Sequence, residues 1–183
     1  TAGKNVALGY QALSSDTLGS NSVALGRAAL FTQNFTTATD SFNTAVGANA
    51  GLSITTGTDN TLIGGLAGDA LTTCEFNVAV GKEALSTDTK GSYNVGVGAL
   101  ALSTQNFSTT TNSHNTAVGG LAGRRITTGT LNVLIGGLAG DSLTDADTNV
   151  AVGVNSLSSD TLGSKSTAVG YKTLETQNFT TAT

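Results

Sequence analysis

The sequence predicts an all-β fold, a parallel β-solenoid of about ten coils. Two observations carry this prediction. The 183-residue chain matches itself when it is shifted by 72 residues, and a motif close to N-[VT]-A-[VLI]-G recurs ten times. A unit of this size cannot bury its own apolar face, whereas stacked units cover one another. At ~4.8 Å per coil, ten coils form a rod about 48 Å long.

The long repeat aligns residues 5–20 with 77–92 and 149–164. It divides one continuous segment, 1–183, into the units 1–72, 73–144 and a partial unit, 145–183. Successive motif glycines lie 17 or 21 residues apart, and we number coils 1 to 10 after them. These glycines are Gly9, Gly26, Gly47, Gly64, Gly81, Gly98, Gly119, Gly136, Gly153 and Gly170.

Each coil should begin with a short strand formed by the motif. The residue before each glycine is aliphatic (Leu8 in coil 1), and the residue two positions earlier is β-branched (Val6). Residues two apart lie on one face of a strand, so this pattern has strand periodicity. We expect these large residues to form the buried face, and the small residue between them, such as Ala7, Ala24 or Ala45, to point outward.

After the strand we expect a turn at the glycine, and then a second short strand or turn around pairs such as Ala12 and Leu13, or Ala84 and Leu85. A polar return limb rich in Thr, Ser, Asp and Gly closes the coil. The glycine should adopt a positive φ or admit a neighbouring backbone.

Asparagine opens the motif in eight coils, with Ser22 and Ser166 in the other two. An amide both donates and accepts, so stacked copies can form a hydrogen-bonded ladder. The ladder residues are Asn5, Asn43, Asn60, Asn77, Asn94, Asn115, Asn132 and Asn149.

The composition agrees with stacking and excludes several functions. Only 11% of residues are charged and proline is absent. Like charges stacked ~4.8 Å apart repel by about 0.9 kcal/mol even in water, and proline removes a backbone donor. The net charge of −4 gives no cationic surface for nucleic acid. No apolar run reaches the ~18 residues that span a membrane, and no signal-peptide pattern is present in this segment.

Two complete 21-residue coils carry a four-residue insertion, and a third insertion begins near the end of the sequence. Each contains the tetrapeptide TQNF, which predicts a protruding loop. An exposed aromatic flanked by amides is a candidate contact for a glycan or a host surface. In the other interpretation, the ring folds over the end of a coil or fills a gap between subunits. The candidate residues are Gln33, Asn34, Phe35, Gln105, Asn106, Phe107, Gln177, Asn178 and Phe179.

No catalytic, cofactor or metal site is predicted, so we expect no enzymatic activity. His114 is the only histidine, and the Cys74 thiol is expected to be incidental. Asp16, Asp88 and Asp160 recur in an [ST]-D-T-x-G turn, where Asp accepts backbone hydrogen bonds.

Two other solenoid functions are disfavoured. A hexapeptide-type acyltransferase needs about 18 residues per coil and a catalytic histidine, which the 17-residue spacing does not match. An ice-binding face needs T-x-T in register, but Thr37 and Thr87 begin such triplets at different coil positions.

The motifs NVALG, NTAVG and NVAVG resemble the head repeats of trimeric autotransporter adhesins, and segments such as NVALGYQALSSDTLGS resemble the tandem repeats of bacteriophage tail-fibre proteins. The resemblance implies a left-handed parallel β-roll, a homotrimer and an extracellular fibre without enzymatic activity. The 17-residue coil and the insertions depart from the adhesin pattern. An outward alanine column would let three subunits approach closely, or it would simply face solvent.

We therefore expect a structural and adhesive fibre segment that attaches to a host surface or spaces a distal receptor-binding tip. A phage tail fibre is the first interpretation. A bacterial surface adhesin or a self-assembling extracellular filament is the alternative, and an ice-binding solenoid is a minor one. No capping element is recognised at either end, so we expect further chain on both sides or end-to-end stacking.

Overall fold

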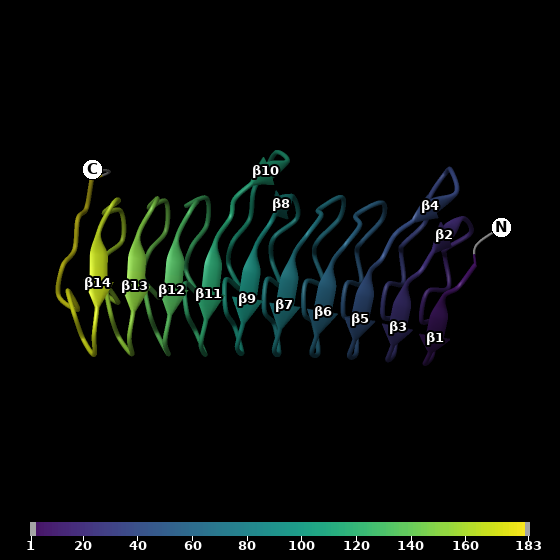
Figure 1. Ribbon diagram of the computed structural model, residues 1–183, viewed down its shortest axis with the longest axis horizontal. Coiled ribbons are helices and arrows are strands. Elements are labelled where there is room, and N and C mark those ends of the chain that lie inside the picture. Colours follow the sequence, from purple (N-terminus) through teal and green to yellow (C-terminus); the bar gives the residue numbers. More distant parts are fainter. Residues whose placement is uncertain (1–2, 182–183) are drawn as a thin grey trace.

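The computed structural model describes residues 3–181, which form a rod of stacked coils with no helix among them (Figure 1). Ten motif strands form one parallel sheet in the order β1-β3-β5-β6-β7-β9-β11-β12-β13-β14. The predicted parallel β-solenoid is confirmed. The strands are β1 (Val6–Leu8), β3 (Val23–Leu25), β5 (Thr44–Val46), β6 (Thr61–Ile63), β7 (Val78–Val80), β9 (Val95–Val97), β11 (Thr116–Val118), β12 (Val133–Ile135), β13 (Val150–Val152) and β14 (Thr167–Val169).

The strands pair in register, motif on motif, in 17- and 21-residue coils alike. Val78 pairs with Val95 across a 17-residue coil, and Val23 pairs with Thr44 across a 21-residue coil. The longer coils keep this register because their extra residues lie outside the motif sheet, where a short strand of each long coil pairs with one of the preceding 17-residue coil. These pairs are β2 (Gly19–Ser20) with β4 (Thr39–Asp40), and β8 (Gly91–Ser92) with β10 (Thr111–Asn112). Figure 1 shows both pairs beyond the row of motif strands.

The predicted orientation of the motif strands is wrong. The small central residue points inward: Ala24, Ala45 and Ala79 are fully buried, whereas Ile63 is 39% exposed and Val169 64%. The alternation was assigned correctly, but alternation alone does not say which face is inside. Because each coil is narrow, the strand faces the turn that follows it, and an alanine leaves room for the large side chains from that turn.

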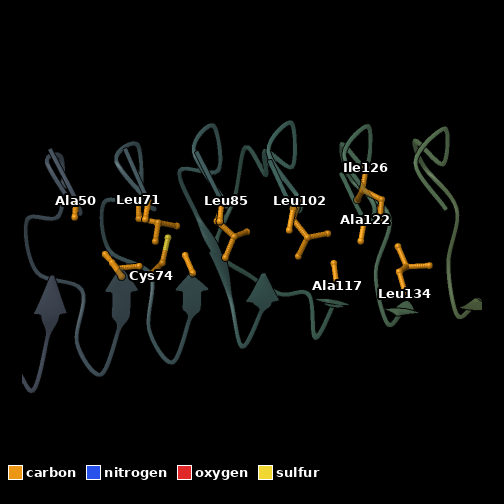
Figure 2. Close-up of a cluster of buried hydrophobic side chains, with 14 of the residues drawn as sticks. Ala50, Leu71, Cys74, Leu85, Leu102, Ala117, Ala122, Ile126 and Leu134 are labelled. Carbon is orange, nitrogen blue, oxygen red and sulfur yellow. The ribbon is translucent and has the colours of Figure 1, made fainter. Parts of the chain in front are cut away.

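The core lies between the sheet and the turns that follow the motif glycines. In Figure 2, Ala117 and Leu134 lie on the strand side, while Leu85, Leu102 and Ile126 lie on the turn side. All five side chains are fully buried. The turn predicted at Ala84 and Leu85 is therefore present, and its leucine lies in the core.

Each motif glycine from Gly9 to Gly153 contacts the glycine of the next coil. A Cβ atom on Gly119 would lie 2.5 Å from the carbonyl carbon of Gly136, and Gly119 also has a φ of +137°. A real Cβ atom does not approach another backbone this closely. The whole column therefore requires glycine, for both reasons expected from the sequence.

The motif asparagines form a buried ladder along the rod. The Asn60 Oδ1 accepts from the backbone N–H of Asn77 at 3.0 Å and from its side-chain amide at 3.2 Å. The Asn77 amide also donates to the carbonyl of Gly91 at 3.0 Å, which ties the strand to the return limb of the same coil. Both asparagines are fully buried, so each amide is satisfied inside the rod rather than by water.

Candidate functional site

The clearest departures from a uniform rod are the two insertions, which we call flap 1 (residues 36–42) and flap 2 (residues 108–114). Both are anchored by the TQNF segment before them. In flap 2, the Gln105 amide donates to the Asp88 carboxylate at 2.5 Å, and its oxygen accepts from Asn115 at 2.8 Å. Gln33, Asp16 and Asn43 repeat this arrangement at flap 1. The chain of three polar side chains links consecutive coils.

The aspartate of the turn motif serves both its own coil and the next one. Asp88 Oδ1 accepts from the backbone N–H of Gly91 at 2.9 Å, as the sequence predicts for this turn. Its other oxygen accepts from Gln105, and Asp88 and Gln105 are both fully buried. The third copy is similar, since Gln177 donates to Asp160 at 2.8 Å and to Ser166 at 3.0 Å. The sequence interpretation missed these pairs, although Gln follows Asp by 17 residues in all three copies.

The TQNF aromatics do not protrude from the complete flaps. Phe35 is 6% exposed and Phe107 is 5% exposed, so of the two interpretations the packed ring holds at these two positions and the exposed ring does not. The backbone N–H of Phe179 donates to the Asp160 carboxylate at 3.0 Å. This hydrogen bond holds the backbone at Phe179 against the aspartate turn of the preceding coil. Phe179 itself is 42% exposed, and a Cβ atom on Gly163 would contact its ring. At Phe179, glycine leaves the space that the ring occupies.

The tips of both flaps are exposed to solvent. Thr36, Thr37 and Ala38 are exposed in flap 1, and residues 108–110 are exposed in flap 2. Asn34 and Asn106 are also exposed, although each accepts a hydrogen bond from a threonine of the preceding coil. Figure 1 shows both flaps on the same side of the rod. Together they present two similar hydroxyl-rich loops four coils apart.

A second feature is a row of residues that immediately precede the motif asparagines, which we call the leading row. Phe76 and Tyr93 stack with ring centroids 5.0 Å apart, and Tyr93 stacks on His114 at the same distance. Phe42 is 54% exposed and Leu131 53%. The row consists of Lys4, Asn21, Phe42, Asp59, Phe76, Tyr93, His114, Leu131, Thr148 and Lys165, all with φ between 47° and 62°. The sequence interpretation missed it, although the row repeats once per coil.

The outward sheet face beside the leading row is uncharged. Its two columns contain only Val, Leu, Ile and Thr, and many of these side chains are half-buried. We call these columns the front face: Val6, Val23, Thr44, Thr61, Val78, Val95, Thr116, Val133, Val150 and Thr167, with Leu8, Leu25, Val46, Ile63, Val80, Val97, Val118, Ile135, Val152 and Val169.

Burial raises the pKa of several side chains in the rod. Burial raises the pKa of the Cys74 thiol to about 11, and its Sγ donates to the carbonyl of Thr89. Burial also raises the pKa of Asp141, although the Arg124 and Arg125 guanidinium groups act in the opposite direction. Arg124 pairs with Asp141 of the next coil at 3.3 Å.

Among residues 3–181 we find no surface pocket and no group of three or more His, Cys, Asp or Glu side chains placed to hold a metal ion. The same residues contain no helix that could cross a membrane. No family model matches the chain, and neither a curated protein nor a solved structure shows significant similarity to it.

Proposed function

We propose that this chain is a structural and adhesive segment of an extracellular fibre, built from three copies. A phage tail fibre is the preferred form, and a bacterial surface adhesin or a self-assembling filament is the alternative. The observation that carries the proposal is the unbroken register of ten coils, because strand pairing connects every coil to the next and the asparagine ladder adds side-chain hydrogen bonds between most of them. Such a rod holds its two ends at a fixed separation, as a spacer requires.

The adhesive part of the proposal now rests on the flap tips rather than on the TQNF rings. Hydroxyl-rich loops on a rigid scaffold suit contact with a glycan or a protein surface. Flaps that repeat every four coils lie ~19 Å apart, so one fibre would offer the same contact several times. Repeated weak contacts on one rigid body add through avidity.

The spacer role can be tested by lengthening the rod. Duplicating residues 77–148 adds one complete unit, and negative-stain images should show the rod extended by ~19 Å. A Gly/Ser insertion of equal length is the control, since a flexible segment should leave the rod unchanged. A compact particle, or a rod that does not lengthen, would contradict the spacer role.

The adhesive role can be tested by binding the labelled protein to a panel of bacterial cells. Changing Thr109→Glu and Thr110→Glu in flap 2 should weaken binding several-fold. Thr56→Glu, on an exposed site of a coil without a flap, should not. Equal binding by the two variants would assign attachment to another surface.

A further inference from the structure

Each TQNF segment is followed by a hydroxyl residue, so that every copy contains an N-F-[ST] triplet. The triplets are residues 34–36, 106–108 and 178–180. Asparagine, then any residue except proline, then serine or threonine is the acceptor pattern for N-linked sugars. Because asparagine, serine and threonine are all common in this chain, the pattern becomes a site only where the structure exposes it.

The other asparagines lack either the pattern or the exposure. In the buried ladder, the second residue after each asparagine is Ala, Leu or Gly, and a side chain such as Asn77 is fully buried. Asn112 in flap 2 is exposed, but His114 stands two positions after it. The acceptor pattern therefore coincides with exposed asparagines only where the TQNF segments lead into the flaps.

The structure presents the two polar residues of a triplet together. Asn106 and Ser108 are both exposed, whereas Phe107 between them is 5% exposed. Exposure alternates in the same way at residues 34–36, and all three residues are exposed at 178–180. In the complete flaps the packed ring holds the segment against the coil, so the amide and the hydroxyl lie on its outward side.

The amide of each triplet is held through its oxygen and is free at its nitrogen. Asn106 Oδ1 accepts from the Thr89 hydroxyl at 3.0 Å, and the equivalent bonds at Asn34 and Asn178 measure 2.8 Å and 3.1 Å. No described residue accepts a hydrogen bond from Nδ2 of these three asparagines. The atom that a sugar would join is therefore available while the rest of the side chain is fixed.

The threonine ladder does not itself require these asparagines. In the coils without a TQNF segment, the equivalent position holds threonine, and its hydroxyl can be satisfied by the backbone of the next coil. Thr72 Oγ1 donates to the carbonyl of Thr89 at 2.8 Å, and Thr144 Oγ1 donates to that of Thr161 at 3.0 Å. Asparagine thus replaces threonine in this column only at the start of a flap.

We propose that Asn34, Asn106 and Asn178 are acceptor sites for N-linked glycosylation, with a sugar diphosphate as the donor and a transferase that recognises the triplet. Nδ2 forms a bond to the anomeric carbon of the sugar, and the bond from that carbon to the diphosphate oxygen breaks. The amide nitrogen gives one proton to a base of the transferase, and the diphosphate leaves with the electron pair. No atom is oxidised or reduced.

Mass spectrometry of peptides from the protein isolated from its source tests the sites. We expect sugar on the peptides that contain Asn34, Asn106 and Asn178, and none on Asn112. A single sugar per site would indicate a nucleotide-linked donor, and a whole oligosaccharide a lipid-linked donor. A rod-shaped protein with three unmodified sites would overturn this inference and leave the proposed fibre intact.

Two neighbouring substitutions in flap 2 test the triplet itself in the same source. Ser108→Ala retains Asn106 but should remove its sugar, whereas Thr109→Ala changes the adjacent exposed hydroxyl and should leave the sugar in place. Both residues are exposed, so both variants should fold. Sugar that persists on Asn106 in the Ser108→Ala variant, or is lost equally from both variants, would contradict recognition of the triplet.

Discussion

Two kinds of coil alternate along the rod and fill their interiors differently. In polar coils (1, 2, 5, 6, 9 and 10), the fourth residue after the motif glycine is leucine and the seventh is Asp or Gln, as in Leu85 and Asp88. In apolar coils (3, 4, 7 and 8), the fourth is glycine and the seventh is Ile or Leu, as in Gly123 and Ile126. Both kinds keep the same strand register.

The difference shows that packing is balanced within pairs of neighbouring coils. Where glycine replaces leucine, a larger side chain occupies the freed space. A Cβ atom on Gly123 would lie 2.7 Å from Leu134 and 3.2 Å from Ile126. Where leucine remains, the seventh position can hold a polar pair, because Asp88 and Gln105 satisfy each other across two coils. Complete flaps emerge from the second polar coil of a pair.

Breaking the hydrogen bond between Asp88 and Gln105 should have the largest effect on the free energy of unfolding. Gln105→Leu removes the donor to one oxygen of the buried Asp88 carboxylate, which keeps its bond from Gly91, and leaves the Asn115 amide with the Gly129 carbonyl as its acceptor. We expect the free energy of unfolding to fall by about 3 kcal/mol, the cost of removing a hydrogen bond from a buried charged group, measured by chemical denaturation. Gln177→Leu is the control, because Gln177 is only partly buried and should cost less. A loss below about 1 kcal/mol would show that the pair is not essential to the polar coils.

Overpacking an apolar coil should have the second-largest effect on the free energy of unfolding. Gly123→Leu restores the leucine of the polar coils but meets the side chains of Leu134 and Leu102. We expect a loss of about 2–3 kcal/mol from overpacking. Leu134→Ala in the same chain should recover part of the loss, since it vacates the occupied space. If the double variant is no more stable than Gly123→Leu alone, the volume exchange between the two kinds of coil is refuted.

The buried Cys74 thiol, which lies in an apolar coil, should make the free energy of unfolding depend on pH. Its pKa is raised to about 11 by burial, so the folded state holds the proton more tightly than the unfolded chain. Stability from this group is therefore present below about pH 9 and decreases as the pH rises toward 11, by up to about 2 kcal/mol. Denaturation of wild type and Cys74→Ala at pH 8 and 10.5 measures the difference. A pH dependence identical in both proteins would contradict it.

The smallest expected effect comes from one substitution made in two equivalent apolar coils. Ile126→Val and Ile54→Val remove the same methylene group from equivalent apolar coils in different units, and both side chains are fully buried. Each should cost about 1 kcal/mol. Thermal unfolding of both variants checks this, and clearly unequal losses would mean that the two units are not packed alike.

Much of the architecture can be predicted from the sequence because the repeats report on one another. The column of motif glycines requires close backbone contact, and the asparagine column supplies amides in register, so Gly119 and Asn77 have the neighbours expected of them. The aspartate turn at Asp88 was also foreseen. These features depend on residues one coil apart, which the repeat spacing reveals directly.

The facing of the strands, the Asp–Gln pairs and the burial of Phe107 depended on the tertiary structure. Hydrophobicity suggests that Val95 and Val97 are inside, but the residue between them, Gly96, is the buried one. The TQNF ring could protrude or pack, and only the space against the coil decides between these alternatives.

The few charges, the absent proline and the repeated glycines determined a stack of coils, because every residue must tolerate its own counterpart one coil away. Tertiary structure decided which surface the stack turns toward solvent. That choice depends on the volume enclosed by each coil, and no single repeat encodes the volume by itself.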